Sequence, residues 1–252
     1  LAYRNRFGNR RSEGTQSTST ENAELDVIRA FDRFVDNRSD NVTNTVDFTY
    51  IKRFENPDQE FNILAQWSEN NRVQNFDASQ QLTVPSSSSF LEKSLNDGLD
   101  REITLQLDYV QPLGKKAKWE MGTKGILRKV TSDGEFLIAQ GEGAFVSAPE
   151  RENFLNYNQD VVSAYSSFTV QLPKDFGLQA GVRYERTLID ADFKDVPNAD
   201  IPDYDNFLPS INISKKIAKR HQFRLSYTQR IQRPSIRFLN PFVDFSNPQS
   251  ID

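Results

Sequence analysis

Residues 102–110 read E-I-T-L-Q-L-D-Y-V, and apolar and polar side chains alternate along them without a break. One face would carry Ile103, Leu105, Leu107 and Tyr109, and the opposite face Glu102, Thr104, Gln106 and Asp108. A two-residue period is that of a β-strand, in which successive side chains point to opposite faces. The segment therefore predicts a strand with one apolar and one polar face.

The same period recurs along the chain, which predicts an all-β, antiparallel fold. Alternating segments occur at 45–50, 61–68, 119–127, 164–172, 178–185 and 223–228, and no charged side chain falls on their apolar faces. No segment shows the 3.6-residue stripe of a helix. About nine strands are expected, within residues 1–9, 24–54, 60–68, 101–111, 116–130, 160–172, 176–188, 207–217 and 222–232.

The connections between these segments alternate in length. Short turn clusters lie at 55–59, 113–116, 173–177 and 218–221, and long polar connections lie near 69–99, 131–159 and 189–206. Outer-membrane barrels have short periplasmic turns and long extracellular loops, whereas soluble sheets usually have short connections at both ends. The pattern predicts a transmembrane β-barrel whose three long connections are extracellular loops.

Alternation alone does not say whether the apolar face points into the protein or out of it. A soluble barrel or sandwich with an apolar core therefore stays open as an alternative. The predicted membrane barrel is also incomplete, because about nine strands would leave two open edges, and unpaired backbone groups are not viable in a bilayer. We expect residues 1–252 to form part of one barrel domain, with further strands and any plug domain absent from the chain.

The composition excludes several classes of function. The chain has no cysteine, one histidine and a formal net charge of -4. Thiol catalysis, Cys-ligated metals and a histidine-based catalytic site with several imidazoles are therefore excluded, and a basic stripe for nucleic acid is absent. We predict no enzymatic activity, no cofactor and no nucleic-acid partner.

Several segments resemble motifs of one known family. They are L-D-Y-V-Q-P-L at 107–113, W-E-M-G-T-K at 119–124, G-L-Q-A-G-V-R-Y-E-R-T at 177–187, Y-D-N-F-L-P-S-I-N-I-S-K-K-I at 204–217, and F-R-L-S-Y-T-Q-R-I-Q-R-P-S-I-R-F-L-N-P-F-V-D-F-S-N-P at 223–248. In this order they resemble the outer-membrane β-barrel family of TonB-dependent receptors of the Bacteroidetes type. The resemblance implies a barrel of roughly twenty-two strands that encloses an N-terminal plug.

Two groups of side chains are candidates for a functional site. Arg183, Arg224 and Arg230 are expected on the lumen face, where they could line a substrate path or pair with carboxylates such as Glu185 and Asp108. Gly122 and Gly181 are expected on the same face, where a side chain would crowd a bend or a plug. No metal site is predicted, although Asp200, Asp203 and Asp205 form a weak candidate for a loop-bound cation beside the simpler interpretation of a solvated acidic loop.

Aromatic side chains fit the interfacial girdles of a membrane barrel, and each is equally compatible with an ordinary strand position. They are Tyr50, Trp67, Tyr109, Trp119, Tyr184 and Tyr227.

Three functional hypotheses follow. By resemblance, the chain belongs to a receptor in the outer membrane of a Gram-negative cell that imports a scarce siderophore, oligosaccharide or peptide. Its partners would then be outer-membrane lipid, its own plug domain, TonB and a surface lipoprotein. The second hypothesis is a binding or adhesion barrel without transport, and the third is a soluble barrel that binds small apolar ligands.

Overall fold

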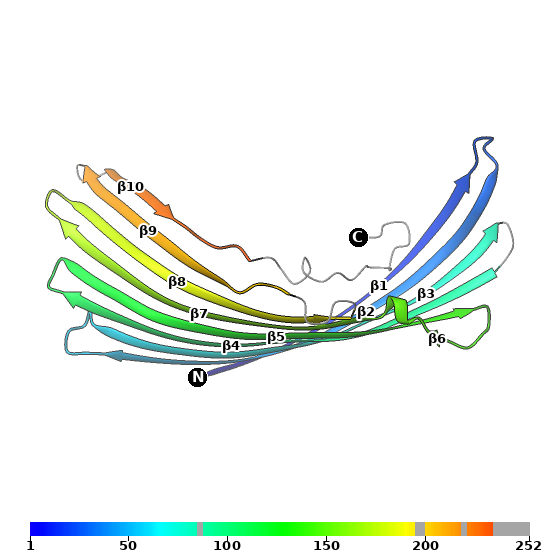
Figure 1. Cartoon of the computed structure of the whole chain (residues 1–252), viewed down its shortest axis with the longest axis horizontal. Helices are drawn as coiled ribbons and strands as arrows, with labels where there is room; N and C mark the ends of the chain where they lie inside the picture. Colours follow the sequence, from blue (N-terminus) through cyan, green and yellow to red (C-terminus); the bar gives the residue numbers. More distant parts are fainter. Residues whose placement is uncertain (85–87, 195–199, 218–220, 234–252) are drawn as a thin grey trace.

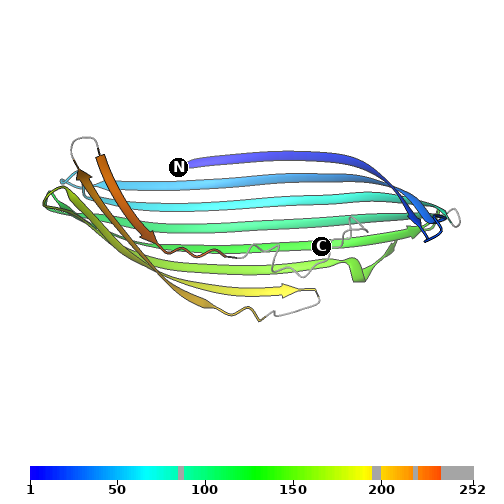
Figure 2. The ribbon, with the colours of Figure 1, turned by 90° about the horizontal axis from the view of Figure 1, so that it is seen from above.

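The computed structural model describes residues 1–84, 88–194, 200–217 and 221–233. These residues form one antiparallel sheet of ten strands, in which each long strand pairs with its neighbours along the chain. Figures 1 and 2 show the sheet as a long curved trough that is open along both edges, β1 and β10. The predicted all-β antiparallel fold is confirmed.

The strands are unusually long for a sheet. They are β1 (Ala2–Glu21), β2 (Val27–Arg53), β3 (Glu60–Val84), β4 (Ser88–Leu113), β5 (Ala117–Gln140), β6 (Val146–Ser147), β7 (Asn153–Leu172), β8 (Phe176–Phe193), β9 (Tyr204–Ile217) and β10 (His221–Thr228), with a 3-10 turn η1 (Pro149–Arg151) between β6 and β7.

The predicted long loops are largely strand, and this part of the prediction is wrong. Residues 69–84 and 88–99 continue β3 and β4, residues 131–140 continue β5, and residues 189–193 complete β8. The pairing of β3 with β4 runs from Glu60–Val110 to Leu82–Ser88 without a register shift. These stretches mix polar and apolar side chains, and part of their inner face is apolar and buried, as at Phe136, Ala191 and Phe193. The regular two-residue hydrophobic period is therefore lost while the backbone ladder continues.

Charged side chains hold the extended ends of the strands together. Arg11 donates two hydrogen bonds to Asp36, at 3.0 and 2.9 Å, and Arg38 donates two more, at 3.2 and 2.6 Å. The hydrogen bonds from these two guanidinium groups lower the pKa of Asp36 to about 2. Because the pKa is lowered in the folded chain, the stabilisation is present above the ordinary carboxyl pKa and is lost only as the pH falls towards 2.

Three of the four predicted short turns lie where the sequence predicts them, at one end of the trough, and the fourth, at 218–221, lies largely outside the described residues. Residues 54–59, 114–116 and 173–175 connect successive strands there. Gly114, Lys174 and Asp175 adopt positive φ, as tight hairpin turns require. At the C-terminal side β10 ends at Thr228, so the strand predicted over 222–232 is shorter than expected.

In a soluble protein the apolar face of a sheet is buried and the polar face is exposed, and in this sheet the arrangement is reversed. Apolar side chains are exposed, as shown by Leu105 at 49% and Leu225 at 72%, whereas Thr104 and Thr187 on the other face are buried at 5% and 0%. Side chains converge on the inside of a curved sheet and diverge on the outside, so the polar face is the inner one. Beside the exposed apolar side chains of the outer face, the inner face is therefore polar, whereas a buried apolar cluster of Leu155, Tyr157, Ala191 and Phe193 lies on the inner face towards the far ends of the strands.

The exposed apolar side chains form a belt around one part of the outer face. Its exposed side chains lie within residues 48–50 of β2, 103–113 of β4, 119–127 of β5, 162–172 of β7, 182–188 of β8 and 207–213 of β9, and the half-buried outer-face residues within 61–67 of β3 continue it. A tilted strand of about ten residues crosses the ~25 Å apolar zone of an outer membrane. We call this zone the apolar belt.

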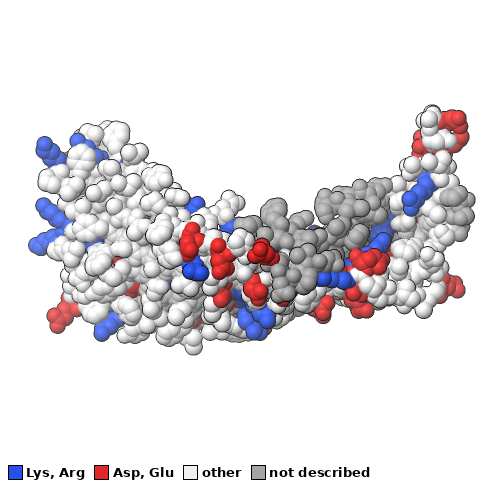
Figure 3. Space-filling model, viewed as in Figure 1, with Lys and Arg blue, Asp and Glu red and all other residues white. Residues whose placement is uncertain are grey.

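The edge of the apolar belt is marked by aromatic and charged residues. Trp67 is the last belt residue of β3, and two residues further on Glu69 accepts a hydrogen bond from Arg101 at 2.6 Å. Near the short-turn end, the Trp119 indole N–H donates to Ser166 at 2.8 Å. In the space-filling view, Lys and Arg gather at the tip of the short-turn end, with white surface beside them (Figure 3).

Leu105→Arg should destabilise the protein in phospholipid vesicles by about 2–4 kcal/mol, because it places a charge in the apolar belt. Leu95→Arg is the matched control, since Leu95 lies on the same strand and face but beyond the belt, where it is 42% exposed. Urea titration of the folded, reconstituted protein measures both. Equal costs for the two substitutions would contradict the position of the belt.

Candidate functional site

The inner face of the sheet is the candidate functional surface, because its polar side chains are crowded together. The strands pair in continuous register, so side chains from successive strands form rows across this face. Buried polar groups must find partners within such a surface. The partners that they find define three clusters.

The first cluster is built around Gly122. This glycine of β5 pairs with Asp108 of β4 and Tyr165 of β7. The Tyr165 hydroxyl reaches across it and donates to Asp108 Oδ1 at 2.8 Å, while Gln106 donates to Asp108 Oδ2 at 2.8 Å. A Cβ on Gly122 would lie 2.6 Å from the Asp108 carboxylate and from the Tyr165 ring. Gly122 therefore faces inward, and it leaves the space that the tyrosine fills.

The second cluster contains two residues that the sequence analysis named. Arg183 and Glu185 of β8 share the inner face and form an ion pair at 2.8 Å, with the Glu185 side chain only 3% exposed. Arg233 forms a second ion pair with Glu185. The pairing of Arg183 with a carboxylate is thus observed for Glu185, whereas Asp108 accepts its hydrogen bonds from Tyr165 and Gln106 instead.

The structure does not gather the three predicted arginines into one site. Arg224 lies in β10 opposite Ser214 and is exposed, whereas Arg230 lies beyond the end of β10. The strand on which the lumen-facing position of Arg230 was based ends two residues earlier. Gly181, by contrast, pairs with Ser167 and Ser210 on the inner face, as predicted.

The third cluster was missed by the sequence analysis. Glu92 of β4 forms ion pairs with Arg33 of β2 at 2.5 Å and with Arg151 of η1 at 2.6 Å. The side chains of Arg33 and Glu92 are 3% and 5% exposed. The Arg151 guanidinium also stacks 5.1 Å above the ring of Phe136. Because residues 69–99 were predicted as a loop, no sequence signal placed Glu92 on the same sheet as Arg33.

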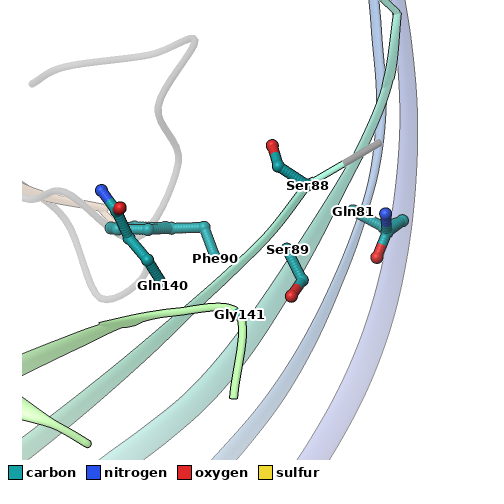
Figure 4. A pocket seen from close by; sticks show the side chains of 6 residues that line it. All are labelled: Gln81, Ser88, Ser89, Phe90, Gln140 and Gly141. Carbon is teal, nitrogen blue, oxygen red and sulfur yellow. The ribbon is translucent and has the colours of Figure 1, made fainter. Parts of the chain in front are cut away.

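A hollow of about 540 Å³ lies at the end of the sheet where β3 and β5 end and β4 begins, with Phe90 two residues from Glu92 along β4. It is lined by Gln81, Ser88, Ser89, Phe90, Gln140 and Gly141 (Figure 4). Phe90 and Gln140 are cross-strand partners on the inner face. The lining is mostly amide, hydroxyl and backbone groups, with one aromatic ring.

The three aspartates that form the candidate cation site do not converge on one point. Asp203 accepts a hydrogen bond from the backbone N–H of Ile189 at 3.2 Å, and Asp205 accepts one from the Tyr184 hydroxyl at 2.6 Å. Asp200 is exposed. Within residues 1–84, 88–194, 200–217 and 221–233, no group of three or more metal-ligating side chains is found. In the same residues, no helix is long and apolar enough to span a membrane.

A sheet with exposed apolar residues outside and buried polar residues inside defines an outer-membrane β-barrel protein. The model of the outer membrane protein beta-barrel family matches residues 52–252, and the chain belongs to this family. The protein is accordingly a component of the outer membrane.

Among solved structures, the chain is similar to the unliganded crystal structure of the ferric citrate transporter FecA, with 11% sequence identity and a TM-score of 0.37. The similarity covers 84% of this chain and 42% of FecA, so the chain spans less than half the length of that transporter. No curated protein matches its sequence.

Gly122→Ala should destabilise the sheet by about 1–3 kcal/mol, because the added methyl group displaces Tyr165 from Asp108. Gly125→Ala in the same strand is the matched control, since a Cβ there meets no atom within 4 Å. Denaturant titration in detergent micelles measures the difference. The explanation fails if both alanine variants unfold at the same denaturant concentration.

Proposed function

We propose that the chain forms part of the barrel of an outer-membrane receptor that imports a scarce ligand with energy transmitted by TonB. The observation that carries the proposal is the inner face, where charged and amide side chains are packed in rows. Such a face suits a water-filled or plugged lumen through which a polar ligand passes. Membership of the outer membrane protein beta-barrel family supports the same role.

The finer features of the proposal come from the sequence motifs. A receptor of the Bacteroidetes type would have roughly twenty-two strands around a plug, and parts of the protein outside this chain would contact TonB. A surface lipoprotein is a further candidate partner. The ligand class stays open among siderophores, oligosaccharides and peptides, and no catalytic role is proposed.

A binding or adhesion barrel without transport is the second candidate. It is favoured by the length of the strands, since β3 and β4 contain 25 and 26 residues and continue well past the apolar belt. The continuation presents a polar, paired surface on one side of the membrane. A partner protein or a surface glycan could dock on it without passing through the barrel.

Both candidates require the long ends of the strands to face the cell exterior. The chain has no cysteine, so in a single-cysteine variant a thiol-reactive reagent labels only the introduced residue and shows on which side of the membrane it lies. Glu142→Cys, in the turn after β5, should react with a membrane-impermeant maleimide on intact cells, and Lys115→Cys, in the short turn between β4 and β5, should react only after lysis. The opposite labelling pattern would invert the topology.

Uptake distinguishes the two candidates. Cells that lack the gene are compared with complemented cells for uptake of labelled ferric siderophores, oligosaccharides and peptides. We expect one class to require both the gene and TonB, and its uptake to stop when the proton-motive force is collapsed. Surface binding of a ligand with no TonB-dependent uptake would favour the adhesion barrel.

A further inference from the structure

The guanidinium group of Arg33 is unusual because it is buried while part of it has no partner. The Arg33 side chain is 3% exposed, and its Nη1 atom faces Glu92 Oε2 at 2.5 Å. Its Nε and Nη2 atoms are buried without a hydrogen-bond partner. Buried N–H groups of a charged side chain are costly to leave unpaired, so such atoms indicate a missing acceptor.

The two unpaired atoms are those of one edge of the guanidinium. Nε–H and one Nη2–H point in parallel from the side of the group, and this pair fits the two oxygens of a carboxylate or phosphate. Glu92 contacts the other end, at Nη1, and leaves this edge unoccupied. Glu92 Oε2 thus forms an ion pair with Nη1 without a hydrogen bond, and the Nε–Nη2 edge has no partner.

The local charge also favours an anion. Glu92 is a single carboxylate between two arginines, because Arg151 contacts its second oxygen at 2.6 Å. The cluster therefore carries one positive charge in excess. Since it is largely withdrawn from water, that charge is weakly screened and attracts an anion more strongly than an exposed arginine would.

The hollow beside the cluster provides room for the rest of a ligand. Arg33 lies in the row Arg33–Gln80–Phe90–Gln140, and the last two residues line the hollow (Figure 4). Neighbouring strands are about 4.8 Å apart, so the backbones of Arg33 and Phe90 are about 10 Å apart. Ser88 and the amide of Gln140, which share the inner face with Phe90, offer groups that hydrogen-bond hydroxyls.

We infer that Arg33 is an oxyanion-binding residue on the inner face of the barrel, and that it selects a ligand bearing a carboxylate or phosphate group with a polar body that occupies the hollow. The inference rests on the proposed receptor function and narrows its ligand class. Neutral oligosaccharides and uncharged peptides lack the group that Arg33 would bind.

The test uses the full product of the gene, purified in detergent, with glucuronate, inorganic phosphate and glucose as probes in calorimetric titration. Glucose is the matched ligand control, because it has the ring of glucuronate without the carboxylate. We expect glucuronate or phosphate to bind and glucose not to bind. Comparing the affinities for glucuronate and for phosphate shows whether the site prefers a carboxylate or a phosphate group.

Two variants of Arg33, one of its partner Glu92 and one control variant test the site. Arg33→Gln should weaken binding of the anion about tenfold or more, and Arg33→Lys should also weaken it, because lysine keeps the charge but loses the fork. Glu92→Gln should strengthen binding, because it removes the competing negative charge. Arg38→Gln, on the same strand but the opposite face, should leave binding unchanged.

The opposite signs of the Arg33 and Glu92 variants keep the test informative even if Arg33→Gln does not fold. Unchanged anion binding in Arg33→Lys together with no gain in Glu92→Gln would overturn the inference, as would equal binding of glucose and glucuronate. The receptor function fails on a different measurement, because it predicts TonB-dependent uptake. Uptake of a neutral ligand that is insensitive to Arg33→Gln would support the receptor and remove the oxyanion site.

Discussion

Every feature of this protein depends on the unbroken hydrogen bonding between neighbouring strands. A backbone N–H or C=O that enters a bilayer without a partner costs several kcal/mol, and only a paired ladder avoids that cost over so many residues. The register of β3 on β4 and of β4 on β5 continues from the short turns to the far ends of the strands. Because neighbouring strands satisfy the hydrogen bonds of the backbone, the choice of each side chain depends on whether its face of the sheet contacts lipid, water or other side chains.

The inner face shows how charges are accommodated under that constraint. Glu92 and Glu185 are the buried glutamates among the described residues, and each is contacted by two arginines. A buried carboxylate without a cation would be strongly destabilising, and one cation for each carboxylate would suffice for neutrality. The second arginine leaves each cluster positive. On the face that a ligand would contact, the excess charge is a basis for selecting anions.

The sequence predicts the fold wherever one face meets lipid. Ile103, Leu105 and Leu107 alternate with polar residues because lipid lies on one side of β4 and polar groups on the other. The same strand was predicted as a loop before residue 100, since water on both sides removes the alternation while the ladder persists. Arg183 and Glu185 were within reach of sequence reasoning, because residues two apart on a strand share a face. The ion pair of Arg33 with Glu92 was not, because it depends on the register of three strands.

The order of the strands has a consequence for how such a barrel can change in size. Apart from the two-residue strand β6, which pairs with β5, each strand pairs only with the long strands before and after it in the chain. Duplicating one hairpin in the gene would therefore insert two strands without exchanging any existing partner. The circumference of the barrel becomes a quantity that evolution can adjust in steps of a single hairpin.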